Sequence, residues 1–187
     1  FRTESSYSDG RRPDSVEFST PERDAQRRDF TINGMFYDPI AHEVIDYVGG
    51  QQDLERRTIR AIGAPEDRIA EDKLRMLRAV RFAARFGFEI DGETRLAVIN
   101  NAKDVSIISG ERIAVEFQKT LATQLSGWAV QEWQELGLLT QILPVFSEVP
   151  CPQVIKNAKA SLSQMQACGW RGKAASLLFN LGVASAG

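Results

Sequence analysis

Before Pro65, hydrophobic residues come in short stretches that have the composition of β-strands and are bounded by turn residues. Alternation with polar neighbours, or a run of β-branched and aromatic residues, predicts four strands at 15–19, 35–37, 44–47 and 58–62. The two middle stretches flank an Asp38-Pro39 turn signal and therefore predict a hairpin. The composition of residues 22–37 also favours a helix. We expect residues 1–64 to form a small mixed α/β domain.

After Pro65 the pattern becomes helical and stays so. Residues 68–86 contain no Gly or Pro and are rich in Ala, Leu, Met and Arg, which predicts one continuous helix ending at a Gly87 C-cap. Hydrophobic spacing predicts further helices at 92–101, around 113–121, at 129–139, and over 153–181 with a break near Gly169. The fold class is thus α+β, with a helical second domain over residues 65–187.

Composition excludes several classes of protein and site. The 187 residues are 43% hydrophobic, enough for a core, yet no apolar run approaches the roughly 18 residues of a membrane span. Two distant cysteines, Cys151 and Cys168, and the single His42 cannot build a disulfide framework, a Cys/His metal site or a Ser-His-Asp triad. We expect a cytoplasmic protein without a membrane partner. Because the chain begins at Phe1 without a signal peptide, we expect it to be a piece of a longer one.

Charge is concentrated in the first half of the chain. Residues 1–95 hold 16 of the 23 Lys and Arg residues and 19 of the 25 Asp and Glu residues, and 15 of those 16 cations are arginine. The planar guanidinium suits carboxylates, phosphates and base edges better than lysine does. This bias indicates a phosphate-bearing ligand; the alternative is a surface of Arg-carboxylate pairs.

Residues 27–33, Arg-Arg-Asp-Phe-Thr-Ile-Asn, form the first candidate cluster. Arg28 and its neighbour could donate to phosphate or ribose, while Asp29 and Asn33 could accept from hydroxyl groups, as a nucleotide pocket requires. In the alternative interpretation, Asp29 and Asn33 cap a helix and the arginines are solvated.

The second cluster lies on the predicted long helix. At about 100° per residue, Glu71, Asp72 and Arg75 fall within about 100° of one another and could face one ligand. A carboxylate that accepts from an exocyclic amine, beside an arginine that donates to a ring nitrogen, would favour adenine and cytosine over guanine and uracil. Arg78 and Arg81 continue as a stripe that could follow a triphosphate. The alternative is ordinary pairing of Arg75 with Glu71 and with Asp72 along the helix.

The third cluster is a glycine pair, Gly49-Gly50, that follows Asp46 between a predicted strand and a helical turn. No Gly-Lys-Ser follows, as a P-loop would require, so we interpret the pair as a hinge. The sequence contains no Asp-x-Asp, the usual carboxylate pair for two divalent ions. We expect Glu22-Arg23-Asp24 and Asp91-Gly92-Glu93 to serve as helix caps.

These clusters occur in a recognisable order, with Phe1-Arg2-Thr3 and Asp9-Gly10-Arg11-Arg12-Pro13 before them and residues 78–83, Arg-Ala-Val-Arg-Phe-Ala, after them. In this order they closely resemble the bacterial class II tRNA nucleotidyltransferase (CCA-adding enzyme) and poly(A) polymerase family. The resemblance is specific over roughly residues 1–95. Later segments, including Glu111-Arg112-Ile113 and Gly137-Leu138-Leu139, look compatible with that family's helical neck and body.

The resemblance implies the C-terminal remnant of a polymerase-β-like nucleotidyltransferase head, followed by a mostly α-helical neck and body that hold the nucleobase and the RNA. It implies that Arg28 and Asp29 contact ribose, that Asp72 and Arg75, supported by Glu71, form the template for the base, and that Arg78 and Arg81 make further nucleotide contacts. Asp46, Gly49 and Gly50 match the family's hinge.

The family's reaction is attack of an RNA 3′-hydroxyl on the α-phosphate of ATP or CTP, with Mg²⁺ held by an Asp-x-Asp. By this resemblance the substrates are ATP, with CTP as a second candidate, and the partner is RNA, in particular the 3′ end of tRNA. The chain itself holds no catalytic residue and no metal ligand of that motif, so we expect it to be inactive alone.

Three alternatives stay open at this point. The first is a poly(A) polymerase instead of an enzyme that adds CCA to tRNA. The second is a non-catalytic RNA-binding module, which would bind RNA in a salt-sensitive way without discriminating among nucleotides. The third is a helical interaction domain in which all the charges are surface pairs.

Overall fold

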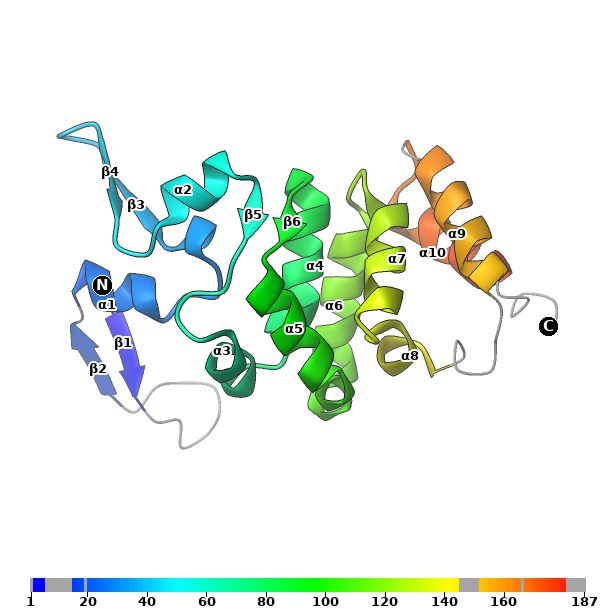
Figure 1. Cartoon of the computed structure of the whole chain (residues 1–187), viewed down its shortest axis with the longest axis horizontal. Helices are drawn as coiled ribbons and strands as arrows, with labels where there is room; N and C mark the ends of the chain where they lie inside the picture. Colours follow the sequence, from blue (N-terminus) through cyan, green and yellow to red (C-terminus); the bar gives the residue numbers. More distant parts are fainter. Residues whose placement is uncertain (1, 6–14, 19, 145–151, 166, 181–187) are drawn as a thin grey trace.

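The computed structural model describes residues 2–5, 15–18, 20–144, 152–165 and 167–180. Its elements follow the chain from strands and short helices at one end of the molecule, through a central group of helices, to a helical pair at the other end (Figure 1). Phe1, the Asp9–Pro13 motif and Cys151 lie outside the described residues. No helix among the described residues has the length and apolar character needed to cross a membrane.

Within the described residues, the strands form three pairs. The antiparallel pairs are β1 (Arg2–Ser5) with β2 (Ser15–Phe18), and β3 (Met35–Asp38) with β4 (Glu43–Asp46). The predicted hairpin is therefore confirmed. The predicted strand at 58–62 is shorter than expected: β5 (Thr58–Ile59) pairs in parallel with β6 (Glu89–Ile90), which joins the first part of the chain to the helical part.

The prediction of helical structure over residues 22–37 is correct for the first residues of this segment and wrong for its centre. Helix α1 (Pro21–Gln26) begins at a Thr20 N-cap, and a single 3₁₀ turn, η1 (Thr31–Asn33), follows after an extended Phe30. Phe30 leaves the helical path because its side chain is buried and its backbone forms a β-bridge with Ala61. Helix α2 (Gly50–Glu55) comes after β4.

The predicted continuous helix over residues 68–86 is wrong. The structure has α3 (Pro65–Glu71) and α4 (Arg75–Phe86), separated at Asp72, whose backbone is extended. The Asp72 carboxylate accepts from the Leu74 N–H at 3.1 Å, so this side chain satisfies a backbone donor at the start of the new helix. Asp competes with the helical backbone in this way, which is why it favours helix ends over interiors. The predicted C-cap at Gly87 is confirmed, with φ of 69°.

Helices are found in each of the remaining predicted regions. The elements are α5 (Gly92–Asn101), the 3₁₀ segment η2 (Ala102–Ile107), α6 (Gly110–Leu121), α7 (Ser126–Glu135), α8 (Leu139–Ile142), α9 (Pro152–Gln164) and α10 (Trp170–Asn180). The two short elements η2 and α8 were not predicted. The predicted helix at 129–139 ends early, at Glu135, because Gly137 adopts a left-handed conformation with φ of 73°. Asp91 caps α5, as expected, by accepting from two N–H groups of its first turn.

Helix α4 takes part in two hydrophobic clusters. Leu77 and Val80 pack into the main core formed by the helices, whereas Ala79 and Phe82 pack against Phe30 in a smaller cluster. The Phe30 and Phe82 rings meet edge to face with their centroids 5.7 Å apart. This contact holds residues 27–33 against α4 and thereby determines where the candidate site forms.

Candidate functional site

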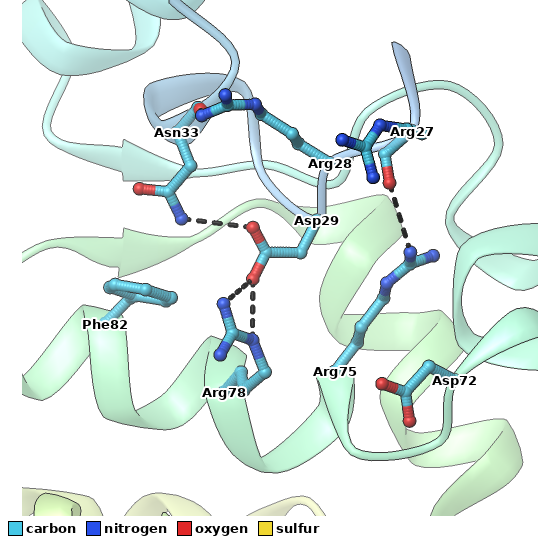
Figure 2. Close-up of a pocket in the computed structure, with 8 residues that line it drawn as sticks. All are labelled: Arg27, Arg28, Asp29, Asn33, Asp72, Arg75, Arg78 and Phe82. Atoms are coloured by element: carbon cyan, nitrogen blue, oxygen red, sulfur yellow. Dashed lines mark hydrogen bonds and ion pairs between the residues drawn. The ribbon is translucent and has the colours of Figure 1, made fainter. Parts of the chain in front are cut away.

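A polar cavity of about 530 Å³ lies where the segment after α1 meets the start of α4. Its wall contains four arginines, two aspartates, an asparagine and an aromatic ring, namely Arg27, Arg28, Asp29, Asn33, Asp72, Arg75, Arg78 and Phe82 (Figure 2). Of the seven residues predicted to contact a nucleotide, five line this cavity. With four guanidinium groups against two carboxylates, the cavity suits an anionic ligand that also carries a polar edge.

A buried carboxylate, that of Asp24, forms ion pairs with two of these arginines. Asp24 is 3% exposed and accepts from Arg27 Nε at 2.7 Å through Oδ1, and from Arg28 Nη2 at 2.9 Å through Oδ2. Burial by itself would raise the pKa of Asp24, but the hydrogen bonds from Arg28 and Arg27 outweigh it and hold the pKa below its ordinary value. Asp24 was expected to be a helix cap; it instead positions two cations that line the cavity.

Asp29 joins the two sides of the cavity. Its Oδ1 accepts from Asn33 Nδ2 at 3.1 Å and its Oδ2 accepts from Arg78 Nε at 2.7 Å, a pair separated by 49 residues (Figure 2). Arg28 in turn donates to the Asn33 carbonyl at 2.8 Å and lies over the Phe36 ring. Arg27 and Arg28 are therefore oriented by ion pairs and hydrogen bonds, and their side chains still remain exposed, as the alternative of solvated arginines expects.

The expectation that Glu71, Asp72 and Arg75 face one ligand from a single helix is wrong, because the helix breaks between them. Glu71 is exposed and lies outside the cavity wall, where it pairs with Arg75 Nη1 at 2.7 Å, as the helix-pairing alternative expects. Asp72 does not pair with Arg75. Its carboxylate accepts from Arg112 Nη2, at 2.9 Å to Oδ2 and 3.1 Å to Oδ1. The break still leaves Asp72 and Arg75 on the same cavity wall.

Arg75 also crosses the cavity. Its Nη2 donates to the carbonyl of Arg27 at 3.3 Å (Figure 2). Its Nη1 donates to the carbonyl of Arg68 at 2.8 Å. Two arginines of α4, Arg75 and Arg78, thus contact the segment after α1, so the first turn of α4 and that segment form one binding surface.

Arg81 lies outside this cavity. It is 7% exposed, its Nε lies 2.5 Å from Glu116 Oε2, and its guanidinium carbon is 4.2 Å from the centroid of the Phe82 ring. The stripe predicted for Arg78 and Arg81 is therefore divided, because a buried glutamate of α6 draws the second arginine away from the cavity.

Sequence reasoning missed three side chains of this site. From the sequence, Asp24 is assigned to a helix cap, and Arg112 and Phe82 only fall within segments that resemble the family, so none of the three receives a role at the site. Asp24 orients two arginines of the cavity wall. Arg112 pairs with Asp72 across 40 residues, a contact that local spacing does not indicate.

The predicted hinge has a defined geometry. Asp46 accepts from four backbone N–H groups, those of Val48, Gly49 and Gly50 through Oδ1 and that of Gln51 through Oδ2, all at 2.9–3.0 Å. Gly49 has φ of 78°, a conformation that favours glycine, and Gly50 packs closely against Met35 and the Thr31 carbonyl. Asp46 thus caps the N-terminus of α2; motion about this segment stays a prediction.

This cap makes the stability of the fold depend on pH. Burial tends to raise the pKa of Asp46, but the four backbone N–H donors outweigh it and lower the pKa below its ordinary value. A depressed folded-state pKa contributes stability above the unfolded pKa of about 3.9, and this contribution is lost as pH falls through the folded value. We expect Asp46→Ala to lower the free energy of unfolding at pH 7 by about 1–2 kcal/mol.

Urea unfolding of Asp46→Ala and of the unmodified chain, measured from pH 7 down to pH 3, checks this prediction. The difference between the two chains should shrink as the pH approaches the folded pKa of Asp46. Asp38→Ala is a second test of the same cause, because this carboxylate lies in an exposed turn and two backbone N–H donors, those of Ala41 and Ile40, lower its pKa. The stability difference that this variant causes should also shrink as the pH falls. A difference that stays constant with pH would contradict the role of the Asp46 charge.

Among the described residues, no three His, Cys, Asp or Glu side chains cluster. The chain contains no Asp-x-Asp. We therefore assign no residue of this chain to a metal and derive no chemical step through one.

Two protein-family models match this chain. One is described as the "Poly A polymerase head domain" and matches residues 1–60; the other is described as "Probable RNA and SrmB- binding site of polymerase A" and matches residues 87–149. The cavity wall combines residues of the first matched region with residues that lie between the two regions. Arg28 and Asp29 belong to the first matched region, and Arg75 and Arg78 lie between the two.

The similar proteins are nucleotide-adding enzymes. The CCA-adding enzyme of Bacillus velezensis is 45% identical over 143 residues, which cover 76% of this chain and 36% of that protein. The crystal structure of the Bacillus stearothermophilus CCA-adding enzyme in complex with CTP is 32% identical with a TM-score of 0.71, covering 90% of this chain and 42% of that one. A CCA-adding enzyme solved with ATP is 26% identical with a TM-score of 0.63, covering 73% and 33%. The chain spans about a third of the length of the curated relatives that it matches, 33–36% for the first three.

Proposed function

This chain belongs to the family of bacterial CCA-adding enzymes and poly(A) polymerases, and from this premise we propose that its polar cavity selects the nucleoside triphosphate that is added to the 3′ end of an RNA. The fold is that of the family's polymerase head and helical body. The observation that carries the proposal is the cavity wall, which combines four guanidinium groups with the carboxylates of Asp72 and Asp29, the second of which pairs with Arg78.

Base selection follows from the chemistry of Asp72 and Arg75. Adenine and cytosine each present an exocyclic amine beside a ring-nitrogen acceptor, so a carboxylate and an arginine complement that edge. Guanine and uracil present the opposite polarity. The Asp72 carboxylate has about four acceptor positions and makes three hydrogen bonds with Leu74 and Arg112, which leaves room for one exocyclic amine.

We assign the sugar and phosphates to the other side of the cavity. Arg28 and Asp29 would contact the ribose, while Arg78 would balance the negative charge of the triphosphate. Glu71 would support Arg75 through their 2.7 Å ion pair. A direct nucleotide contact by Glu71 or Arg81 stays a prediction, since neither lines the cavity.

The proposed substrates are ATP and CTP, as expected for a chain similar to CCA-adding enzymes solved with each of them. The proposed partner is the 3′ end of tRNA, and the names of the relatives favour CCA addition over poly(A) tailing. We place the protein in the cytoplasm, where tRNA is processed in bacteria. Mg²⁺ would belong to the whole enzyme's chemistry.

We also propose that residues 1–64 and 65–187 act as two domains. The cavity would then lie at their boundary, because Asp29 and Arg27 come from one side, and Arg78 and Arg75 come from the other. Movement at Asp46 and Gly49-Gly50 would alter the first domain close to its cavity segment, since Gly50 packs against the Thr31 carbonyl.

Thermal unfolding in the presence of each triphosphate tests the proposed function. A ligand that binds the folded state at 100 times its Kd adds about 2.7 kcal/mol, which raises the Tm of a domain of this size by about 5–10 °C. We expect ATP and CTP to raise the Tm, and GTP, UTP and inorganic triphosphate to raise it less. Equal shifts for all four nucleotides would contradict base selection and favour a non-selective RNA-binding module; no shift with any of them would overturn the proposed function.

A further inference from the structure

A second cavity, of about 650 Å³, lies farther along α4 and is also lined by cations. Its wall consists of Arg81 and Arg85 from α4, Lys119 from the last turn of α6, and residues 122–124 after that helix. None of these side chains is acidic and none is aromatic. The wall therefore suits a phosphate group and offers no platform on which a base could stack.

The second cavity is adjacent to the first. The guanidinium carbons of Arg78 and Arg81 lie over the same Phe82 ring, 5.3 and 4.2 Å from its centroid. Arg78 and Phe82 line the nucleotide cavity, whereas Arg81 lines the second one. A single aromatic ring and its two cations thus separate the two cavities.

Glu116 fixes the charges between the cavities. This carboxylate is 2% exposed, and its oxygens lie 2.5 Å from Arg81, 3.5 Å from Lys119 and 4.0 Å from Arg78. Glu116 compensates the charge of the buried Arg81, so Arg81 shapes the wall of the second cavity and adds little net charge to it. Arg85 is exposed, and the side chain of Lys119 is 54% exposed, so these two cations can reach a ligand.

The spacing along α4 fits a nucleic-acid strand that leaves the nucleotide cavity. Arg78 and Arg85 are seven residues apart on one face of the helix, a distance of about 10 Å along its axis. A stacked strand carries one phosphate per about 3.4 Å of axis, so this distance corresponds to about three nucleotides. A triphosphate bound in the first cavity would already have Arg78 as a partner.

We propose that the second cavity binds the phosphodiester backbone of the RNA strand whose 3′ end receives the nucleotide, with Arg85 and Lys119 as the contacting side chains. This inference rests on the proposed function, because it requires an RNA end beside the selected nucleotide. Contacts to phosphates position a strand and carry no sequence information. The second cavity therefore contributes affinity and register, and base selection stays with Asp72 and Arg75.

The test compares the full chain with its Arg85→Gln/Lys119→Gln variant. The probe is a single-stranded RNA oligonucleotide with a free 3′-hydroxyl, titrated by fluorescence anisotropy at several salt concentrations. We expect the Kd for RNA to rise about tenfold near 0.1 M salt, and the slope of log K against log salt to fall by about 1.4, or about 0.7 for each lost phosphate contact. The Kd for ATP should change less than about twofold.

The matched control is Lys103→Gln/Lys156→Gln, which removes two exposed lysines that line neither cavity. An RNA affinity that falls equally in both double variants, or in neither, overturns the proposal. A loss of ATP affinity as large as the loss of RNA affinity assigns the cavity to the triphosphate instead. Absence of RNA binding by the unmodified chain also overturns it, whereas selective stabilisation by ATP and CTP would leave the proposed function standing.

Discussion

Replacing Glu116 by Ala is expected to lower the free energy of unfolding by about 3–5 kcal/mol, a large fraction of the stability of a typical domain. The loss of stability comes from Arg81, which would lose the carboxylate that it pairs with. Arg81 is 7% exposed, and its Nε lies 2.5 Å from the Glu116 carboxylate, so the variant would bury an uncompensated guanidinium. Urea unfolding at pH 7, followed by far-UV circular dichroism, measures the change.

Two further variants test the cause of that loss. Glu111→Gln, in the exposed first turn of the same helix, should change stability by less than about 1 kcal/mol. The double variant Arg81→Leu/Glu116→Leu should recover most of the loss, since apolar residues of similar volume often replace a buried ion pair without cost. A loss below about 1.5 kcal/mol in Glu116→Ala would contradict a desolvated pair at this position.

Replacing Arg78 by Gln is expected to weaken binding of all nucleoside triphosphates by about tenfold or more. Arg78 balances ligand charge at the centre of the cavity and fixes Asp29 through a 2.7 Å hydrogen bond. A charge-assisted hydrogen bond contributes about 1.5–3 kcal/mol, which corresponds to a factor of about 10–150 in Kd. The preference for ATP and CTP over GTP and UTP should persist, because Asp72 and Arg75 are unchanged.

Calorimetric titration of the variant with each triphosphate measures both quantities. Arg56→Gln, an exposed arginine outside the cavity wall, is the matched control and should leave all four affinities unchanged. A folded Arg78→Gln variant that binds ATP as tightly as the unmodified chain would contradict this arrangement of the site.

Local sequence pattern was sufficient for the elements that depend on local chemistry. The hairpin at residues 35–46 follows from strand-forming residues around a turn, and α5 and the Gly87 cap follow from capping residues. The cluster at 27–33 and Asp72 with Arg75 could be singled out because donors and acceptors lie at close spacing there, although ordinary ion pairing explains the same pattern. That selection came from residue type together with the family resemblance, before any geometry was known.

The break between α3 and α4 and the partners of the site arginines could not be predicted from helical periodicity alone. The break at Asp72 results from competition between a side chain and the helical backbone, and Arg112 then pairs with that carboxylate from 40 residues away. Arg81 has the same spacing pattern as a cavity residue, yet the buried Glu116 draws it to the second cavity. Helical periodicity places side chains on a face but does not identify the partner that they meet.

Base selection at Asp72 is the central claim, and one calorimetric titration tests it most directly. ATP, CTP, GTP and UTP are titrated in turn into the unmodified chain and into Asp72→Asn, which keeps an oxygen acceptor for the Leu74 N–H but presents an amide donor in place of a carboxylate oxygen. We expect ATP and CTP to bind the unmodified chain at least about tenfold more tightly than GTP and UTP, and this ratio to fall towards one in the variant. A preference for ATP and CTP that survives in a folded Asp72→Asn variant, or equal binding of all four nucleotides by the unmodified chain, would contradict the account.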